Sequence, residues 1–117
     1  FNVWGTGKPL REFLHVDDLA SASIFLMEKL KVAEIEKSNN SYFNIGSKEE
    51  ISIKELSKII KKIMDFNGEI SFDISTLDGT PRKLLNSKLI NDMGWSSNIS
   101  LKAGLVSVIN EFKENFN

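Results

Sequence analysis

The order of the predicted elements indicates an α/β fold. Segments typical of strands and of helices alternate along the 117 residues, in the order strand, helix, strand, helix, strand, helix, helix. Hydrophobic residues make up 41% of the chain and charged residues 26%, which is the mix of a folded globular protein. Since no internal repeat, low-complexity tract or linker interrupts the chain, we expect a single unit or a piece of a larger domain.

The first part of the chain is predicted to hold a strand followed by a long buried helix. We expect a loop over Phe1–Pro9, because its glycines and proline discourage regular structure, and a strand over Arg11–Val16. A helix is predicted over Leu19–Lys29, with Asp17 and Asp18 just before it as acceptors for its unpaired amides. This helix is apolar on several sides, so we expect it to pack against more structure than 117 residues supply.

The middle of the chain is predicted to hold a strand and an amphipathic helix. A polar loop over Glu34–Ser41 precedes a short strand over Tyr42–Ile45. Ser52 and Glu55 match a capping box, in which hydroxyl and carboxylate satisfy two backbone donors. The helix after it ends at Asn67-Gly68, and its apolar face consists of Leu56, Ile59, Ile60, Ile63 and Met64.

The last part is predicted to hold one strand and two helices. Alternation predicts a strand over Glu69–Ile74, and Asp78–Pro81 reads as a turn. Ser87 is expected to cap a short helix that reaches Met93, with Gly94 as its stop. Ser100 is expected to cap a final amphipathic helix whose inward side chains are Leu101, Leu105, Val108, Ile109, Phe112 and Phe116.

Composition excludes several classes of function. A net charge of −1 gives no overall basic field for nucleic acid or an anionic membrane, and no apolar run is long enough for a spanning helix. The chain has no cysteine and one histidine, so disulfides, thiolate metal sites and multi-histidine metal centres are excluded. These features favour the cytoplasm, with neither nucleic acid nor a membrane as a partner.

Candidate catalytic motifs are incomplete. Gly5-Thr6-Gly7 is not read as a dinucleotide loop, because Leu10 stands where a third glycine is required and no strand-to-helix junction is predicted there. Tyr42 has Gly46 four residues later, where a Tyr–Lys hydride-transfer pair needs lysine. His15 is interpreted as a hydrogen-bonded residue that orients the start of the first helix. We therefore assign no catalytic, cofactor-binding or metal-binding residue.

Two loops place cations next to turn-forming residues. Arg11 follows the loop that contains Trp4, and Lys83 follows the turn that contains Asp78. Arginine offers a planar fork to phosphate oxygens and lysine a mobile point charge, as a nucleotide diphosphate requires. Asp78 is a candidate acceptor for ribose hydroxyls or guanine N–H groups. Trp4 is a candidate for stacking its indole on a base or a sugar. The alternative reading is solvated surface charge and a core tryptophan.

A family resemblance rests on these same residues. The run Val3–Ala20, with the sequence VWGTGKPLREFLHVDDLA, resembles the segment after the Rossmann core in extended short-chain dehydrogenases that act on nucleotide sugars. Phe43–Gly46 resembles the last strand of their cofactor sheet. Asp78–Asn86 resembles the substrate loop of a GDP-sugar epimerase-reductase in that family, and Met93–Trp95 the turn after its next helix.

The resemblance implies a fold class and a role. The chain, residues 1–117, is expected to be the C-terminal substrate-binding portion of such a Rossmann-type fold, without the N-terminal cofactor domain that would hold NADP(H). Trp4, Arg11, Asp78 and Lys83 fall on positions that contact a GDP-sugar, and the parent protein is expected to be a homodimer. The catalytic residues would lie upstream, so the fragment alone is expected to be inactive. Another nucleotide-sugar epimerase or dehydratase, a free-standing binding module and a purely structural domain remain as alternatives.

Overall fold

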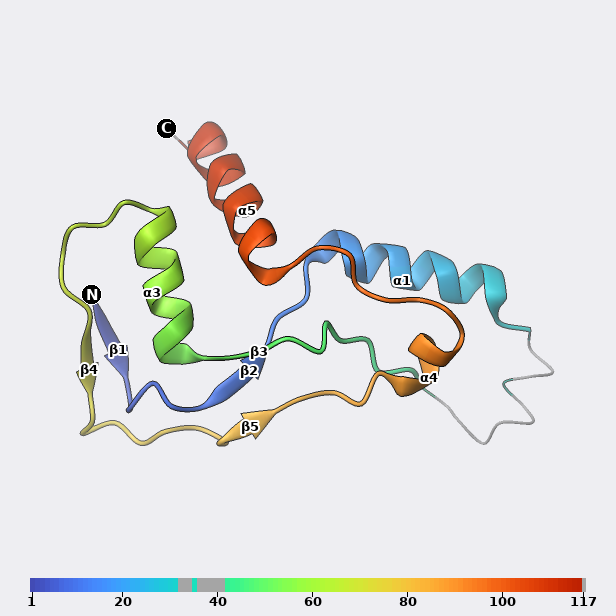
Figure 1. Cartoon of the computed structure of the whole chain (residues 1–117), viewed down its shortest axis with the longest axis horizontal. Coiled ribbons are helices and arrows are strands. Elements are labelled where there is room, and N and C mark those ends of the chain that lie inside the picture. The colour runs from blue at the N-terminus through green and yellow to red at the C-terminus, as the bar shows by residue number, and fades with distance from the viewer. Residues whose placement is uncertain (32–34, 36–41, 117) are drawn as a thin grey trace.

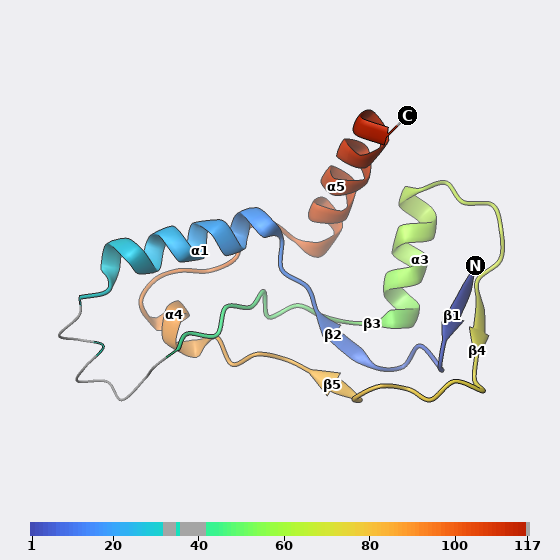
Figure 2. The same cartoon turned by 180° about the vertical axis from the view of Figure 1, so that it is seen from behind.

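The computed structural model describes residues 1–31, 35 and 42–116, and it has an elongated α/β arrangement. The elements follow the order β1 (Asn2–Trp4), β2 (Leu10–Glu12), α1 (Val16–Lys29), β3 (Glu50–Ser52), α3 (Ile53–Ile63), β4 (Ser71–Asp73), β5 (Arg82–Lys83), α4 (Lys88–Asp92) and α5 (Leu101–Phe116). Figures 1 and 2 show β1, β4 and α3 at one end, α1 and α4 at the other, and β2, β3 and β5 between them.

Two small sheets organise these elements. β1 pairs in parallel with β4, so that Val3 lies opposite Phe72. In the second sheet β2 lies between β3, which is antiparallel to it, and β5, which is parallel. Segments about 70 residues apart in the sequence are therefore neighbours in both sheets.

The buried core joins α1 to α4 and to the turn that follows α4. Ala22, Ile90 and Trp95 are buried, and Phe43 and Ile45 pack against them. The indole Nε1 of Trp95 donates to the Ser21 hydroxyl at 3.1 Å, which satisfies the one polar atom of that ring. This core is small for a chain of 117 residues.

Much apolar surface stays open, in agreement with the expectation for the first helix. The radius of gyration is 17.7 Å, whereas a compact domain of this length has about 13 Å. On α1, Val16, Leu19, Ile24 and Met27 are exposed. None of the helices in the described ranges combines the length and the apolar run that crossing a membrane requires.

The first helix begins earlier than predicted, and its cap is a different residue. α1 starts at Val16, and the Nδ1 of His15 accepts the amide of Asp17 at 3.2 Å. Asp17 and Asp18 therefore lie in the first turn instead of before it. Asp18 is buried, and its two carboxylate oxygens accept the amides of Asn98 and Ile99, each at 3.0 Å. The carboxylate thus binds α1 to the chain that leads into α5.

Several strand predictions were wrong. The strand predicted over Arg11–Val16 is shorter and begins one residue earlier, as β2, and β3 and β5 were not predicted. Asn2–Trp4 lies within the predicted loop, yet it forms β1, because its partner β4 is too distant in the sequence for a local pattern to reveal. Tyr42–Ile45 forms no strand. A strand needs neighbours for its amides and carbonyls, and within the described chain no strand pairs with this segment. The predicted strand over Glu69–Ile74 forms, shortened to β4, and the predicted loop at Glu34–Ser41 falls mostly outside the described residues.

For α3, the predicted start is right and the predicted end is wrong. The capping box of Ser52 and Glu55 is confirmed, with both reciprocal hydrogen bonds present. α3 ends at Ile63 instead of at Asn67-Gly68, because Asp65 adopts the left-handed conformation (φ 52°) that usually selects glycine. The amide of Phe66 then bonds back to the Lys61 carbonyl at 3.0 Å and closes the helix.

The last two helices form where predicted, with differences in detail. Ser87 precedes α4 but makes no capping hydrogen bond, since its hydroxyl donates to the Asn91 side chain instead. The Ser100 hydroxyl accepts the Ala103 amide at 3.3 Å, as predicted. Val108 and Phe112, predicted to point inward, are exposed. α5 lies beside α3, and part of its apolar face stays exposed.

Candidate functional site

Arg11 and Lys83 lie on neighbouring strands. β2 and β5 run in parallel, and Arg11 is the direct register partner of Lys83. The Leu10 amide donates to the Pro81 carbonyl at 2.8 Å and fixes the start of this pairing. Side chains of register partners stand on the same face of a sheet, so the two cations share one face. Folding thus brings together two loops that the sequence presents far apart.

The Arg11 guanidinium is held in place by the turn before β5. Its Nη1 donates to the Leu10 carbonyl at 2.6 Å and to the Thr80 carbonyl at 2.8 Å. A guanidinium has five donor hydrogens, so several remain for a ligand after these bonds are made. A Cβ added at Gly79 would lie 3.3 Å from Nη2, which shows how closely the turn approaches the cation.

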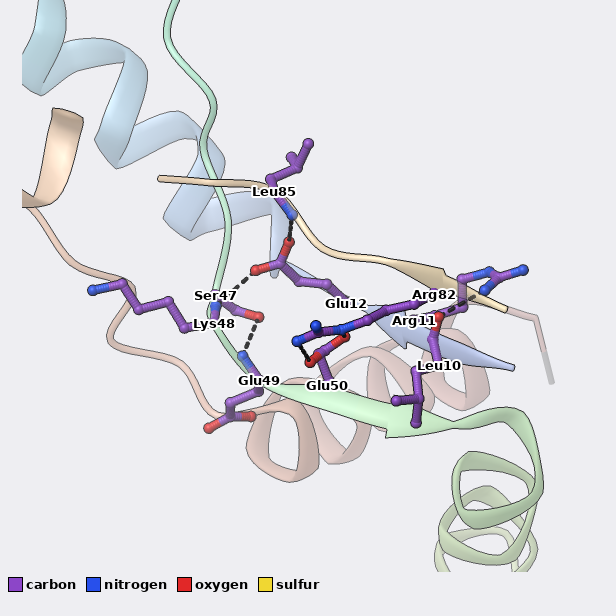
Figure 3. Close-up of polar contacts among 9 residues, drawn as sticks. All are labelled: Leu10, Arg11, Glu12, Ser47, Lys48, Glu49, Glu50, Arg82 and Leu85. Atoms are coloured by element: carbon purple, nitrogen blue, oxygen red, sulfur yellow. Dashed lines mark hydrogen bonds and ion pairs between the residues drawn. The ribbon is translucent and has the colours of Figure 1, made fainter. Parts of the chain in front are cut away.

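Arg82 points to the opposite face of the sheet and pairs with Glu50. Its Nε and Nη2 bond to the two carboxylate oxygens at 2.7 and 2.5 Å (Figure 3). The hydrogen bonds and the opposite charge lower the pKa of Glu50 and raise that of Arg82. Lys83 is exposed, and among the described residues its ammonium makes no hydrogen bond or ion pair. Of the adjacent Arg82 and Lys83, only Lys83 therefore presents an uncompensated charge.

Asp78 joins the first loop to the turn. One carboxylate oxygen accepts the Thr6 amide at 2.8 Å and the other accepts the Thr6 hydroxyl at 2.6 Å. Gly5 has a φ of 78°, and a Cβ added there would lie 2.2 Å from Asp78 Oδ1. Only glycine combines this backbone conformation with so close an approach. The side chain that was predicted as a ligand contact thus already has a structural role inside the chain.

Trp4 lies apart from the two cations. It is 78% exposed, which excludes the reading as a core tryptophan. Its side chain borders a cavity of about 600 Å³ between β1 and α3, whose other lining residues include Phe1, Leu56, Ile60, Met64 and Phe66. Arg11, Asp78 and Lys83 do not line this cavity. The structure therefore brings three of the four predicted residues to one region and leaves Trp4 just before the loop that Asp78 anchors.

His15 has the orienting role predicted for it. Its Nδ1 caps α1, and its side chain is largely buried beside Gly104 of α5, where an added Cβ would lie 2.8 Å from the ring. Three residues with a part in the site were not found from the sequence: Thr6, Glu12 and Glu50. Glu12 and Glu50 are charged residues on short strands. Alternation along the strand, which places Glu12 on the face opposite Arg11, is the one signal that could have pointed to Glu12.

We expect the carboxyl of Asp78 to titrate below its ordinary pKa. The Thr6 hydroxyl and amide both donate to it, and Lys8 adds a positive charge. Because the folded pKa is lowered, the contact stabilises the fold above the ordinary pKa and is lost as the pH falls through the lowered value. A carboxyl NMR titration of the Thr6→Val variant should show the Asp78 midpoint moving upward, whereas Thr80→Val should leave it unchanged. An unmoved midpoint in Thr6→Val would show that this contact does not hold the loop.

Sequence comparison supports the predicted family. Residues 1–46 match the NAD dependent epimerase/dehydratase family. Over 113 residues, 97% of this chain, it is 49% identical to the probable GDP-L-fucose synthase 1 of Oryza sativa subsp. japonica and covers 32% of that protein. It is 45% identical to the GDP-L-fucose synthase of Escherichia coli (strain K12) over 115 residues, 97% of this chain and 36% of that protein. The chain spans about a third of the length of the curated relatives it matches.

A solved structure extends the similarity to the fold. The GDP-mannoheptose C4 reductase from Campylobacter jejuni with NADP bound is 38% identical and aligns with a TM-score of 0.83, covering 96% of this chain and 34% of that one. The predicted resemblance to nucleotide-sugar epimerases and reductases is therefore confirmed, and so is the α/β class with a place in a Rossmann-type fold.

Proposed function

We propose that this chain is the C-terminal, GDP-sugar-binding part of a GDP-L-fucose synthase. The reaction of the whole protein would convert GDP-4-keto-6-deoxy-D-mannose into GDP-L-fucose, by epimerisation at C3 and C5 and then NADPH-dependent reduction at C4. Protons beside a ketone are acidic enough for removal by a general base, which gives the epimerisation a chemical route. The similarity to named GDP-L-fucose synthases over 97% of the chain supports this proposal.

The observation that carries the binding role is the pairing of Arg11 with Lys83 across β2 and β5. A pyrophosphate carries charge on two linked phosphate groups, so two cations on one face can bind both groups at once. The turn carbonyl of Thr80 holds the Arg11 guanidinium, so binding orders few additional degrees of freedom. Fixing the diphosphate in this way also fixes the position of the attached sugar.

Asp78 and Trp4 complete the proposed site in different ways. Asp78 holds the Gly5–Gly7 loop through Thr6, and each of its oxygens keeps a lone pair for a nucleotide hydroxyl or amide. Trp4 is exposed at the start of that loop, where its indole is open to a base or a sugar ring. The role of both residues is to place the nucleoside relative to the cations.

The Gly5–Gly7 loop is not arranged to bind the phosphates of a dinucleotide cofactor. The Thr6 amide, which a phosphate-binding loop would direct at its ligand, is already bonded to the Asp78 carboxylate, and no helix begins after Gly7. A negative carboxylate at this position would repel a phosphate. We therefore place NADP(H) on the part of the protein that the relatives carry beyond the matched third.

The rest of such a protein would also cover surfaces that are open in this chain. The exposed apolar side chains of α1 would pack on a cofactor-binding domain, with residues 1–117 as the substrate-binding portion. The segment Phe43–Ile45, which joins neither sheet of the described chain, would pack there too. As a partner of the whole protein we propose a second copy, giving a homodimer, and as its location the cytoplasm.

The full-length protein provides the direct test. We expect it to oxidise NADPH when GDP-4-keto-6-deoxy-D-mannose is supplied and to form GDP-L-fucose, with product identified by chromatography. Absence of NADPH oxidation with this sugar would contradict the proposal. Activity on a different GDP-keto sugar would instead support the reductase reading, which the similarity to a GDP-mannoheptose C4 reductase favours as second candidate.

A calorimetric titration of residues 1–117 with GDP tests whether this chain is a free-standing binding module instead of a part of an enzyme. Weak or absent binding is expected, because the proposed site is an open surface that does not enclose its ligand. Submicromolar affinity of the isolated chain would favour the binding module.

A further inference from the structure

We infer that Glu12 is a positioning residue that sets the spacing between Arg11 and Lys83, an inference that rests on the proposed function. Glu12 follows Arg11 directly on β2, so its side chain stands on the opposite face of the sheet. It is partly buried and lies directly across from Glu50 of β3. Two carboxylates opposite each other are unfavourable unless each has its own partners. The carboxylate of Glu50 is paired with Arg82. The carboxylate of Glu12 is bonded to backbone amides instead, and these bonds indicate its role.

The carboxylate of Glu12 binds the backbone on both sides of β2. Oε1 accepts the amide of Lys48 at 2.7 Å, and Oε2 accepts the amide of Leu85 at 3.1 Å (Figure 3). Lys48 lies in the segment that leads into β3, and Leu85 lies two residues after Lys83 in the continuation of β5. One side chain of the central strand thus binds the chain next to each of its two neighbours.

The backbone around this carboxylate is shaped to admit it. A Cβ added at Gly46 would lie 2.5 Å from Oε1 and 2.8 Å from Oε2, so a larger residue there would displace the carboxylate. Lys48 has a φ of 65°, a conformation that residues other than glycine seldom adopt. In this conformation the Lys48 amide donates to the Glu12 carboxylate. The strained backbone of Lys48 is thus found where its amide binds Glu12.

The consequence concerns the opposite face of the sheet. β5 is two residues long and pairs with β2 only at Leu10–Arg82 and Arg11–Lys83. So short a pairing is weakly specified by itself, and the Glu12–Leu85 contact fixes how far β5 lies along β2. The distance between the Arg11 and Lys83 charges depends on that register. Glu12 would therefore control pyrophosphate binding without touching the ligand.

The same carboxylate connects two parts of the chain with different proposed partners. Gly46 and Lys48 follow directly on Phe43–Ile45, which we propose packs on the cofactor-binding domain. β2 and β5 carry the cations proposed to bind the substrate. Glu12 is thus a hydrogen-bonding link between the segment proposed to face the cofactor part and the strands proposed to hold the GDP-sugar.

The experiment compares Glu12→Gln with Glu111→Gln in the full-length protein. Gln at position 12 keeps one acceptor oxygen but turns an NH2 group toward a backbone N–H, so one of the two bonds is lost. We expect the KM for the GDP-sugar to rise about tenfold or more, with the KM for NADPH unchanged, because a small displacement of binding groups weakens substrate positioning. Glu111 is exposed on α5, so Glu111→Gln removes the same charge and should leave the KM for the GDP-sugar unchanged. An unchanged GDP-sugar KM in Glu12→Gln would overturn the inference.

A double-mutant cycle distinguishes positioning from general stabilisation. If Glu12 acts through Lys83, the effect of Glu12→Gln on the GDP-sugar KM should largely disappear in a Lys83→Met background. Additive effects would show that Glu12 acts elsewhere and would overturn the inference. Should Glu12→Gln fail to fold, Glu12→Asp, which is too short to reach both amides, takes its place in the same cycle.

The outcome is separable from that of the proposed function. If the wild-type protein does not oxidise NADPH with any GDP-keto sugar, the proposed enzyme activity fails, and GDP binding measured by calorimetry replaces KM in the cycle. Coupling between Glu12 and Lys83 in GDP binding would then support the positioning role alone. Absence of GDP binding in the wild type would overturn both.

Discussion

Replacing Lys83 with Met in the full-length protein is expected to raise the KM for the GDP-sugar at least tenfold. Met keeps most of the length and apolar surface of the side chain and removes its charge. A charge-assisted hydrogen bond to phosphate contributes roughly 1.5–3 kcal/mol, which corresponds to a factor of about ten or more. Beyond the backbone pairing of β5, the side chain of Lys83 makes no hydrogen bond or ion pair with the described residues, so the thermal midpoint should not change. Steady-state kinetics with the GDP-sugar varied at saturating NADPH measures the effect.

Lys113→Met is the matched control for this variant. Lys113 is exposed in the last turn of α5, far along the chain from the β2–β5 face, and its loss should leave the KM for the GDP-sugar at the wild-type value.

Arg82→Met tests the stability of the fold instead of substrate binding. Because Arg82 is paired with Glu50 on the other face, its loss should reduce stability more than substrate affinity. If Lys83→Met and Lys113→Met behaved alike, Lys83 would be ordinary surface charge.

Replacing Asp18 with Ala is expected to destabilise the protein by about 2–4 kcal/mol. Its buried carboxylate accepts the amides of Asn98 and Ile99, and each buried donor left without an acceptor costs about 1–3 kcal/mol. The loss should separate α1 from the chain that leads into α5. Thermal unfolding of the full-length protein should show a midpoint lower by about 5 °C or more.

Asp17→Ala provides the comparison for Asp18. The side chain of Asp17 is 77% exposed, and its contribution is limited to a favourable charge in the first turn of α1, about 0.3–1 kcal/mol. Two adjacent aspartates in the same turn should thus differ clearly in their effect on stability. Equal effects of both replacements would show that the buried carboxylate does not hold α1 to the segment before α5.

Local chemistry made the starts of α3 and α5 predictable. The Ser52–Glu55 capping box and the Ser100 cap depend on residues within four positions of one another, and both form as the sequence indicates. The end of α3 was misplaced because Asp65 adopts a conformation for which glycine is the usual signal. β1 was missed and the strand at Tyr42–Ile45 was wrongly predicted for one shared reason. Whether a short segment becomes a strand depends on a partner that its own sequence does not specify.

The same distinction applies to the candidate site. Arg11 and Lys83 were identified from chemistry and resemblance as residues of two separate loops, and their register across β2 and β5 is a long-range property. The sequence alone could not decide which of Arg82 and Lys83 was available, because that depends on the position of Glu50, more than 30 residues away. Glu12 was overlooked because its partners are backbone amides, which leave no pattern in the sequence.

A crystal structure of the full-length protein with GDP bound would test the binding role of the β2–β5 face most directly. We expect phosphate oxygens within hydrogen-bond distance of both the Arg11 guanidinium and the Lys83 ammonium, with the Arg82–Glu50 pair intact on the other face. GDP bound at another surface, with Arg11 and Lys83 both in contact with solvent, would contradict it.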